Sequence, residues 1–297
     1  MKKLFYFAPL FIVAAACQNA NSGESGDSLK DSTQVETKVV EKLKGSLEQV
    51  WETDTSLTTN ESVFYNELDG LFYVSCINGQ PLEKDNNGYI AQLNANGQIA
   101  KLKWAEGLSA PKGMAQLNGK LYVTDIDRLV AISLEDPSSQ ENYPVEGAQF
   151  LNDVTVLNEV VYFTDMQTGK IHQLKNNQVE TLRTGHENVN GVAAADGKLY
   201  ALDGKGLHEI PLDGGTPKTI NSTLTGGDGL IHISDSTFVA SRWQGEIWIL
   251  RGQESFKMLD SKAKNIQTAD IGYLPTKKLI LVPRFFSNKV TAMRLQY

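Results

Sequence analysis

The sequence has little of what marks several large classes of protein. Its 297 residues include only two cysteines, which excludes a small scaffold held together by disulfide bonds. Beyond the N-terminal segment, no apolar run reaches the roughly 18 residues of a membrane-spanning helix, so a membrane bundle is excluded. A basic excess is also lacking, because 28 lysines and arginines stand against 35 aspartates and glutamates. The formal charge of −7 argues against nucleic acid as a partner.

Motifs with a well-defined chemistry are scarce as well. The four histidines are scattered, with no His-x-His or His-Glu-x-x-His spacing, so no zinc-type ligand set is indicated. The glycine-rich segment Gly226–Gly229 lacks the Lys-Ser/Thr ending of a phosphate-binding loop. Cys76 has no visible basic partner, and we interpret it as a buried core thiol. With 41% hydrophobic and 21% charged residues, the composition is that of a globular protein.

The first 17 residues have the pattern of a secretory signal. Lys2 and Lys3 are followed by an apolar stretch at positions 4–13 and by three alanines. At ~1.5 Å per residue this stretch is too short to cross a bilayer, which argues against a transmembrane anchor. Cys17, directly after the alanines, resembles the lipidated cysteine of bacterial lipoproteins, which implies removal of residues 1–16. Gln18 in place of aspartate implies an outer-membrane lipoprotein facing the periplasm, whereas a plain secreted protein would leave Cys17 without a role.

After the signal, the chain is expected to form a flexible tether. Positions 18–38 are rich in Ser, Asn, Gly and acidic residues and nearly free of large apolar side chains, so they cannot bury a core. Cleavage would remove two lysines and leave 26 basic against 35 acidic residues, a charge of −9. We therefore expect a signal peptide at 1–16, a lipidated cysteine and tether at 17–45, and one domain at 46–297.

From residue 61 onwards, one pattern repeats six times. A polar residue and a short residue precede an apolar strand, and a turn and a second strand ending in a polar residue follow. The repeats start, at intervals of 51, 40, 38, 38 and 41 residues, with Glu61, Lys112, Asn152, Asn190, Asp228 and Ala269. Repeats of roughly 40–45 residues made of short strands are typical of a β-propeller. The sequence thus predicts an all-β protein, a six-bladed β-propeller, whereas an open β-sandwich would not explain six aligned repeats.

The last repeat is incomplete. Only 29 residues remain from Ala269, enough for three strands rather than four. We predict that the missing outer strand is Glu48–Glu52, supplied from the N-terminal side of the domain. Such a closure joins the two ends of the ring and leaves no open sheet edge within it.

The first residues of the repeats share one face of the predicted ring, because the strands of a blade run antiparallel. Carboxylate and amide oxygens gather there near the central channel and suit a hard divalent cation; they belong to Glu61, Asn152, Asn190 and Asp228. The structural alternative is that these side chains cap strand starts or bond between blades. Lys112, in the same ring, would compete with a metal ion or bind an anionic group of a substrate.

The ends of the second strands are assigned mainly structural roles. Three of these strands end in aspartate, at Asp125, Asp165 and Asp203. The first two resemble the structural Tyr-Trp-Thr-Asp repeats of receptor propellers. Arg242 and Arg284 end two further second strands and are expected to pair with such acids between blades.

The repeat starts carry short motifs similar to those of a known family. They are an Asn-Gly, an Asp-Gly and an Asn-Asp pair and a lone glutamate, which begin at Asn190, Asp228, Asn152 and Glu61. These motifs resemble the blade starts of regucalcin (senescence marker protein), gluconolactonases and related lactonases, which are six-bladed propellers. The resemblance implies that Glu61, Asn190 and Asp228 hold one divalent metal ion. It also implies that Asn152 contacts substrate and that Asp228 acts as general base, whereas Phe150 replaces an arginine that the family often has.

Three functions follow from these observations. The resemblance implies a metal-dependent hydrolase of a lactone or related small ester, with calcium, magnesium or zinc as cofactor and with Asn152 and Lys112 binding substrate. The first alternative is a non-catalytic ligand- or protein-binding propeller on the cell envelope, because a fold does not determine function. The second is a strictosidine-synthase-like propeller without a metal. The expected partners are a small-molecule substrate and, through the lipid alone, the membrane, and the protein is expected to be a monomer.

Overall fold

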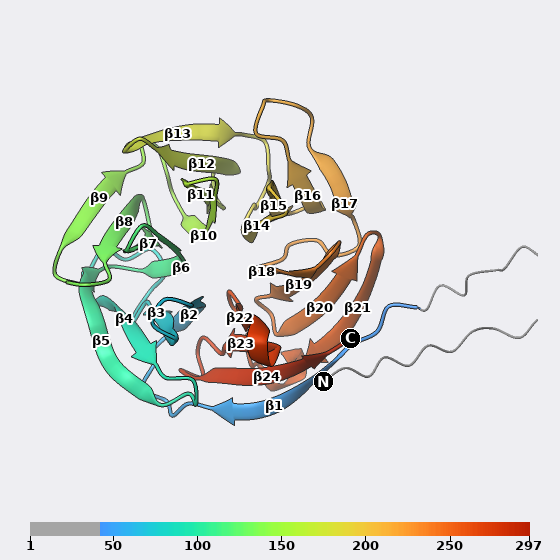
Figure 1. The fold of residues 1–297 in the computed structure, drawn as a ribbon, viewed down its shortest axis with the longest axis horizontal. Helices are drawn as coiled ribbons and strands as arrows, with labels where there is room; N and C mark the ends of the chain where they lie inside the picture. Colours follow the sequence, from blue (N-terminus) through green and yellow to red (C-terminus); the bar gives the residue numbers. More distant parts are fainter. Residues whose placement is uncertain (1–41) are drawn as a thin grey trace, which may run out of the picture. The chain divides into compact units, whose positions relative to one another are not determined.

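Six four-stranded antiparallel β-sheets surround a central axis in residues 42–297, the part of the chain that the structure, a computed structural model, describes (Figure 1). Each sheet is one blade, with its innermost strand at the axis and its outermost strand on the rim. The predicted all-β class and six-bladed β-propeller are therefore confirmed. Besides strands, these residues contain two short 3₁₀ helices, η1 (Lys262–Lys264) and η2 (Pro275–Lys277). No helix in this part of the chain is long and apolar enough to cross a membrane.

Blades 1 to 5, numbered in chain order, consist of consecutive strands listed from the axis to the rim. Blade 1 has β2 (Asn60–Asn66), β3 (Leu71–Cys76), β4 (Gly88–Leu93) and β5 (Ile99–Leu108). Blade 2 has β6 (Pro111–Leu117), β7 (Lys120–Asp125), β8 (Arg128–Ser133) and β9 (Gln140–Pro144). Blade 3 has β10 (Leu151–Leu157), β11 (Val160–Asp165), β12 (Lys170–Lys175) and β13 (Gln178–Arg183). Blade 4 has β14 (Val192–Ala195), β15 (Lys198–Asp203), β16 (Gly206–Ile210) and β17 (Lys218–Asn221), and blade 5 has β18 (Leu230–Ser234), β19 (Thr237–Arg242), β20 (Glu246–Arg251) and β21 (Glu254–Asp260).

Blade 6 combines the two ends of the domain. It consists of β22 (Gly272–Leu274), β23 (Leu279–Pro283), β24 (Val290–Gln296) and, on the rim, β1 (Ser46–Glu52). β1 pairs antiparallel with β24, with Ser46 opposite Gln296 and Glu52 opposite Thr291, and the two strands lie side by side in Figure 1. The closing strand predicted at Glu48–Glu52 is thus confirmed and begins two residues earlier.

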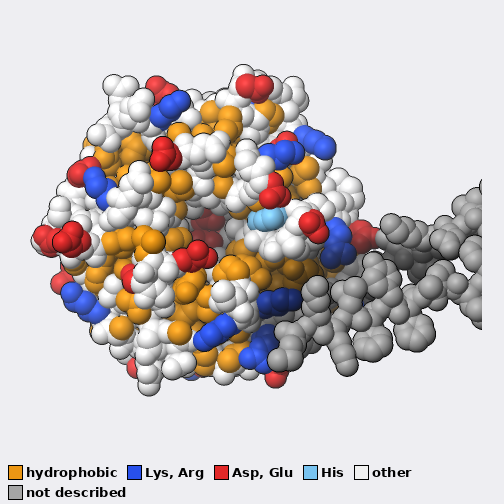
Figure 2. All heavy atoms as spheres, in the orientation of Figure 1, with side chains coloured by type: hydrophobic (Ala, Val, Ile, Leu, Met, Phe, Trp, Pro, Cys, Tyr) orange, Lys and Arg blue, Asp and Glu red, His pale blue; other side chains and the backbone are white. Residues whose placement is uncertain are grey.

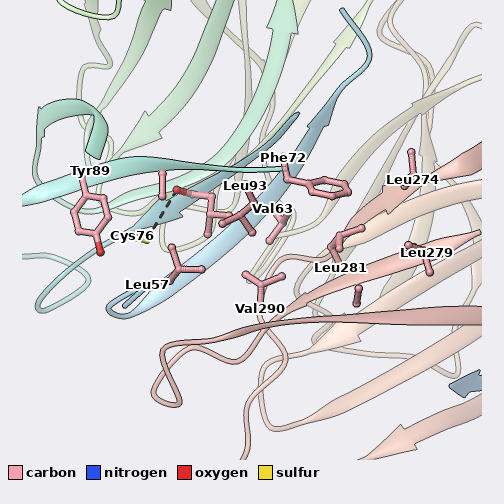
Figure 3. Close-up of a cluster of buried hydrophobic side chains, with 13 residues drawn as sticks. Leu57, Val63, Phe72, Cys76, Tyr89, Leu93, Leu274, Leu279, Leu281 and Val290 are labelled. Atoms are coloured by element: carbon pink, nitrogen blue, oxygen red, sulfur yellow. Dashed lines mark hydrogen bonds between the residues drawn. The ribbon is translucent and has the colours of Figure 1, made fainter. Parts of the chain in front are cut away.

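The core of the propeller lies between neighbouring blades. Each of the six interfaces between blades holds one cluster of buried apolar side chains. Figure 3 shows the cluster between blades 6 and 1, where Phe72 and Leu93 meet Leu281 and Val290. Cys76 belongs to this cluster and is fully buried, and burial raises the pKa of its thiol to about 12. The interpretation of Cys76 as a core thiol is confirmed.

The aspartates at the ends of second strands fix the loops that precede the first strands. Asp125 accepts hydrogen bonds from the backbone N–H groups of Ser109 and Ala110, at 3.1 and 2.7 Å, and from the Arg128 guanidinium at 2.7 Å. Asp165 likewise accepts backbone N–H groups of the loop before β10. The structural role predicted for these acids is confirmed.

The predicted pairing of the two arginines between blades is wrong. Arg242 bonds at 3.1 Å to Glu246, which lies in its own blade. Arg284 is buried and donates to the Thr291 hydroxyl at 3.2 Å, and in the described part of the chain no acid lies within ion-pair distance of it. The reason is that a tight turn brings the next strand of the same blade closer to a strand end than any acid of a neighbouring blade.

The predicted signal peptide, the lipidation of Cys17 and most of the predicted tether lie outside the described residues. The last part of the predicted tether, residues 42–45, is described and contacts the propeller. Leu43 is buried, and its backbone N–H donates to the Glu254 carboxylate at 3.3 Å. The packed part of the chain therefore starts a few residues before β1.

Candidate functional site

The side chains that start the inner strands form a ring at one end of the channel, and we call this set the polar ring. Its members are Glu61, Lys112, Asn152, Asn190 and Asp228, and all five are buried. Ala269 takes the sixth position and is also buried. The structure brings Asn190 and Asp228 into direct contact, because the Asn190 amide Nδ2 donates to the Asp228 carboxylate at 2.7 Å.

Irregular strand pairing sets the direction of these side chains. The register between first and second strands shifts between Asn60 and Ser62 in blade 1 and between Leu151 and Val154 in blade 3. Such bulges redirect side chains and are frequent next to binding sites. As a result, two successive residues at a strand start reach the channel, rather than every second one.

Several oxygens of this region are buried without a hydrogen-bond partner. They are Glu61 Oε2, Asn152 Oδ1, Asn190 Oδ1 and Asp153 Oδ1. An unpaired buried acceptor costs free energy, and a bound cation would supply the missing interaction. The donor set of Glu61, Asn190 and Asp228 therefore fits a divalent cation by its chemistry. Within residues 42–297, no three His, Cys, Asp or Glu side chains are placed to hold a metal ion, so a site here depends on amide oxygens.

Four carboxyl groups share the channel, two of which the sequence analysis missed. Glu61 and Asp228 were predicted as site residues, and Asp153 and Asp270 follow directly after repeat starts. Burial raises the pKa of Asp228 and of Asp270 to about 7, and for Asp228 the nearby charge of Asp270 adds to the effect. Burial and the neighbouring acids raise the pKa of Glu61 and Asp153 well above the usual range. The sequence signal that marks the two missed acids is their place in the second position of a repeat.

Small residues let the inner strands approach one another at this level. Three of the six second positions are glycine: Gly113, Gly191 and Gly229. A Cβ atom on Gly191 would lie 2.4 Å from the Asp228 carbonyl oxygen, and one on Gly229 would lie 2.5 Å from the Asp270 carboxylate. The glycine of each Asn-Gly or Asp-Gly motif is thus required by the neighbouring strand, whatever the ring binds.

Lys112 is fully buried, but it does not form an ion pair with the acids of the ring. Its ammonium donates to the backbone carbonyls of Ala110 at 2.9 Å and Pro81 at 3.2 Å, and it lies 4.7 Å from the centre of the Phe150 ring. Burial lowers the pKa of Lys112 to about 8, against the opposing effect of Glu61. Phe150, the departure from the family pattern, therefore has a local role as a partner of this cation.

An apolar cluster lies at the same end of the channel as the polar ring. It consists of Ile77, Ala110, Ile126, Ala269 and Phe285, which come from blades 1, 2 and 6. Beside it, the Trp243 ring meets Phe285 and Phe286 edge-on, with ring centres 5.8 and 5.9 Å apart. Trp243 is 40% and Phe286 63% exposed, so an aromatic surface borders this end of the channel.

The opposite end of the channel is hollow. A cavity of about 540 Å³, which we call the central cavity, is lined by residues of all six inner strands, beyond their first positions. Figure 2 shows acidic side chains at the bottom of a central hollow. Asp153 and Asp270 line this cavity, whereas Glu61, Asn190 and Asp228 do not. The open space therefore begins beyond the predicted metal ligands, and Asp153 and Asp270 lie between the cavity and the polar ring.

Propellers of several kinds share this fold among solved structures. Virginiamycin B lyase from Staphylococcus aureus has a TM-score of 0.59 at 14% identity, over 84% of this chain and 99% of that one. Regucalcin from Agrobacterium tumefaciens, a calcium-binding protein, has a TM-score of 0.58 at 17% identity, over 81% of this chain and 87% of that one. For luciferin-regenerating enzyme the TM-score is 0.60 at 14% identity, over 84% and 95% of the two chains. No protein-family model and no curated protein matches this chain.

At these identities the similarity establishes the fold. The regucalcin-like six-bladed propeller expected from the sequence is confirmed as an architecture. The same architecture is present in a lyase, a calcium-binding protein and a luciferin-regenerating enzyme, so the reaction has to be argued from the residues of this chain.

Proposed function

We propose that this propeller is a metal-dependent hydrolase of the lactonase type, in which Glu61, Asn190 and Asp228 hold one divalent cation. The observation that supports it is the set of unpartnered buried oxygens on Glu61 and Asn190, in a ring where Asn190 already bonds Asp228. Ligands that are all oxygens favour calcium or magnesium over zinc. The calcium-binding regucalcin of the same fold agrees with this choice of cation.

Each residue of the polar ring would have a separate role in hydrolysis. When bound, the cation would polarise the carbonyl group of a lactone or small ester and stabilise the developing oxyanion. Asp228 would accept a proton from the attacking water, because a nearby positive charge favours its ionised form and offsets the burial that raises its pKa. The unpartnered amide oxygen of Asn152 would orient the substrate, and Lys112 would favour an anionic or electron-rich group near blade 2.

Replacing the proposed base tests both parts of this function. Asp228→Asn keeps the size of the side chain but removes its charge, so we expect loss of bound calcium and a fall in lactone hydrolysis of about 100-fold or more. Metal analysis of the purified protein and a panel of lactones and small esters measure the two effects. The matched control is Asp213→Asn, because Asp213 is an exposed loop acid whose oxygen accepts the Gly215 N–H at 3.0 Å, a bond that asparagine preserves. Full calcium content in Asp228→Asn would refute the ligand assignment.

A second candidate function is non-catalytic binding of a ligand or protein. The burial of all five ring residues and the apolar cluster over blades 6, 1 and 2 favour this alternative, because they restrict the approach of a substrate. The aromatic surface of Trp243 and Phe286 would then contact that ligand or protein. Calcium-loaded wild-type protein that hydrolyses no member of the panel would decide for this second function.

The same proposal includes attachment to the cell envelope through Cys17. We expect Cys17→Ser to abolish labelling by a radioactive fatty acid and to move the protein from the outer-membrane fraction to the soluble periplasm. The matched control is Ser22→Ala, which changes a hydroxyl residue of the same segment without touching the cysteine. Unchanged labelling and fractionation of Cys17→Ser would contradict the lipoprotein assignment.

A further inference from the structure

We infer that the central cavity is a binding site for a small organic ammonium ion, with the ammonium group held between Asp153 and Asp270 and the apolar part of the ligand towards the open end. This site adjoins the polar ring but uses other residues, and it does not depend on the hydrolase proposed above. The size of the cavity, its charged groups and one unpartnered carboxylate oxygen support such a ligand.

The cavity has the dimensions of a small-molecule site. Its volume of about 540 Å³ falls within the range of roughly 300–1,000 Å³ that is usual for ligand pockets, and it is far larger than a metal ion needs. The walls combine apolar and aromatic residues, such as Phe64, Val154 and Ile231, with polar ones, such as Gln116 and Thr155. The apolar part of these walls would accommodate a short hydrocarbon chain, and the polar part leaves room for water beside it.

Asp153 gives the strongest indication of a missing ligand. Its side chain lines the cavity although the residue is only 3% exposed, and its Oδ1 atom has no hydrogen-bond partner. The backbone of Val192 donates to the carboxylate, so one side of the group is fixed and the other is free. A buried carboxylate oxygen without a donor is costly, and a charged donor offers the largest compensation.

Asp270 faces Asp153 across the channel. Asp153 lies in blade 3 and Asp270 two residues before β22 of blade 6, and blades 3 and 6 are opposite in a ring of six. Ser62 Oγ donates to Asp270 Oδ2 at 2.5 Å, which orients this second carboxylate. An ammonium group on the axis would therefore have an acceptor on each of two opposite sides.

The charges along the cavity favour a cation. The acidic residues among its lining residues are Glu67, Asp153 and Asp270, and the described chain places no lysine or arginine there. His232 also lines the cavity, and its Nε2 lies at 2.7 Å from the backbone carbonyl oxygen of Asp235. An anionic ligand would meet only acids at the bottom of the cavity.

An ammonium head fits the bottom of the cavity better than a bare metal ion does. A calcium ion takes about six to eight oxygen ligands. The glycines at the second positions of blades 2, 4 and 5 supply no side-chain oxygens at this level, and no metal-binding group of three acids is formed in residues 42–297. Two opposite carboxylates and one hydroxyl suit the three N–H donors of a primary ammonium ion.

The test compares three probes of equal length and different charge. Protein treated with a chelator at pH 8 is titrated with n-hexylamine, 1-hexanol and hexanoate, and binding is followed by ligand-observed NMR and calorimetry. We expect n-hexylamine to bind and hexanoate not to bind, with 1-hexanol weaker than the amine by about tenfold or more, because a charge-assisted bond is lost. Binding of 1-hexanol as strong as that of n-hexylamine would overturn the proposal.

Two variants and one control locate the site. Asp153→Asn and Asp270→Asn keep the shape of the side chains and are each expected to weaken n-hexylamine binding by about tenfold or more. Asp235→Asn removes one charge from an exposed turn beside the cavity wall and is expected to leave the affinity unchanged. Unchanged affinity in both cavity variants would refute the site, and so would a cavity that responds to calcium chloride and to no amine. Loss of calcium in Asp228→Asn with intact amine binding would show that the two sites are independent.

Discussion

A chain that begins at residue 54 is expected to lose cooperative folding, whereas a chain that begins at residue 42 should retain it. The shorter chain lacks β1, which pairs with β24 at six positions. Each backbone hydrogen bond contributes about 0.5–1.5 kcal/mol, so the pairing is worth several kcal/mol, a large part of a typical stability of roughly 5–15 kcal/mol. Urea unfolding followed by circular dichroism measures the difference between the two chains.

The loss extends beyond hydrogen bonds. Trp51 of β1 packs against Phe72 of blade 1, with ring centres 6.1 Å apart, and Lys289 bonds Glu52 at 2.6 Å. Without β1, β24 becomes an exposed edge that can pair with another copy of the chain. We therefore expect the shorter chain to aggregate as well, visible as larger species in size-exclusion chromatography. A single, equally stable transition for both chains would contradict the closing role of β1.

The free energy of unfolding of the metal-free protein is expected to fall as the pH rises from about 4 to about 8. The pKa of Asp228 and of Asp270 is raised to about 7 in the folded chain, whereas an unfolded chain has aspartates near 3.9. Between these values the folded state binds more protons than the unfolded state, so stability is highest at low pH and is lost through the folded pKa. Each such carboxyl changes the free energy by up to about 1.4 kcal/mol per pH unit.

The charged groups around these two acids do not reverse the sign. Glu61 and Asp153 also have raised pKa values, because they are buried among acids, so they act in the same direction. Lys112 is the cation of the polar ring, and its pKa of about 8 places its titration at the upper end of this window. Bound calcium should offset the loss of stability at pH 8, if Asp228 is a ligand.

One variant isolates the effect of the acidic cluster from the rest of the titration. Asp270→Asn retains an acceptor for the Ser62 hydroxyl but cannot ionise. At pH 8 it should be more stable than the wild type by a few kcal/mol, and at pH 4 the two should be nearly equal. The control Asp235→Asn should follow the wild type at both values. Urea unfolding of Asp270→Asn that shows the same pH dependence as the wild type would refute the raised pKa of Asp270.

Much of the fold can be predicted from the sequence because each blade corresponds to one copy of a repeated sequence pattern. Glu61, Asn152 and Asp228 each start an inner strand at a similar point of its repeat, so the number of blades follows from counting. The closing strand follows from length, because 29 residues cannot supply four strands. These inferences use spacing and alternation, which the regular parts of the strands obey.

The candidate site could be predicted only in part, because the side chains at the starts of the inner strands do not alternate regularly between the two faces of the sheet. In blade 3 the register shifts between Leu151 and Val154, so both Asn152 and Asp153 reach the channel. A simple two-residue period directs Asp153 away from the channel when Asn152 faces it. The same period directs Asp270 away from the channel when Ala269, the first residue of its repeat, faces it.

The apolar cluster of Ile77, Ala110, Ile126, Ala269 and Phe285 was not predicted either. Ile126 and Phe285 lie in short loops and have positive φ values of 58° and 33°, which are uncommon for such side chains. Nothing in the sequence around them indicates that the loops turn inwards. The sequence therefore indicates the polar residues at the strand starts but not the apolar side chains that lie at the same end of the channel.

The pairing of Ser46 with Gln296 brings the two ends of the domain together, which makes circular permutation of the propeller feasible. Residues at the two ends of the domain are neighbours in one sheet, about 5 Å apart in the pairing direction. A short linker would turn the domain into a closed circle, and a new opening in any exposed turn would give a circularly permuted chain with the same six blades. The position of the termini then decides which blade comes first along the chain. The permuted protein should be stable when its new termini lie between two blades. Termini inside a blade are tolerated when a strand from one end of the chain pairs with the other end, as β1 pairs with β24 here.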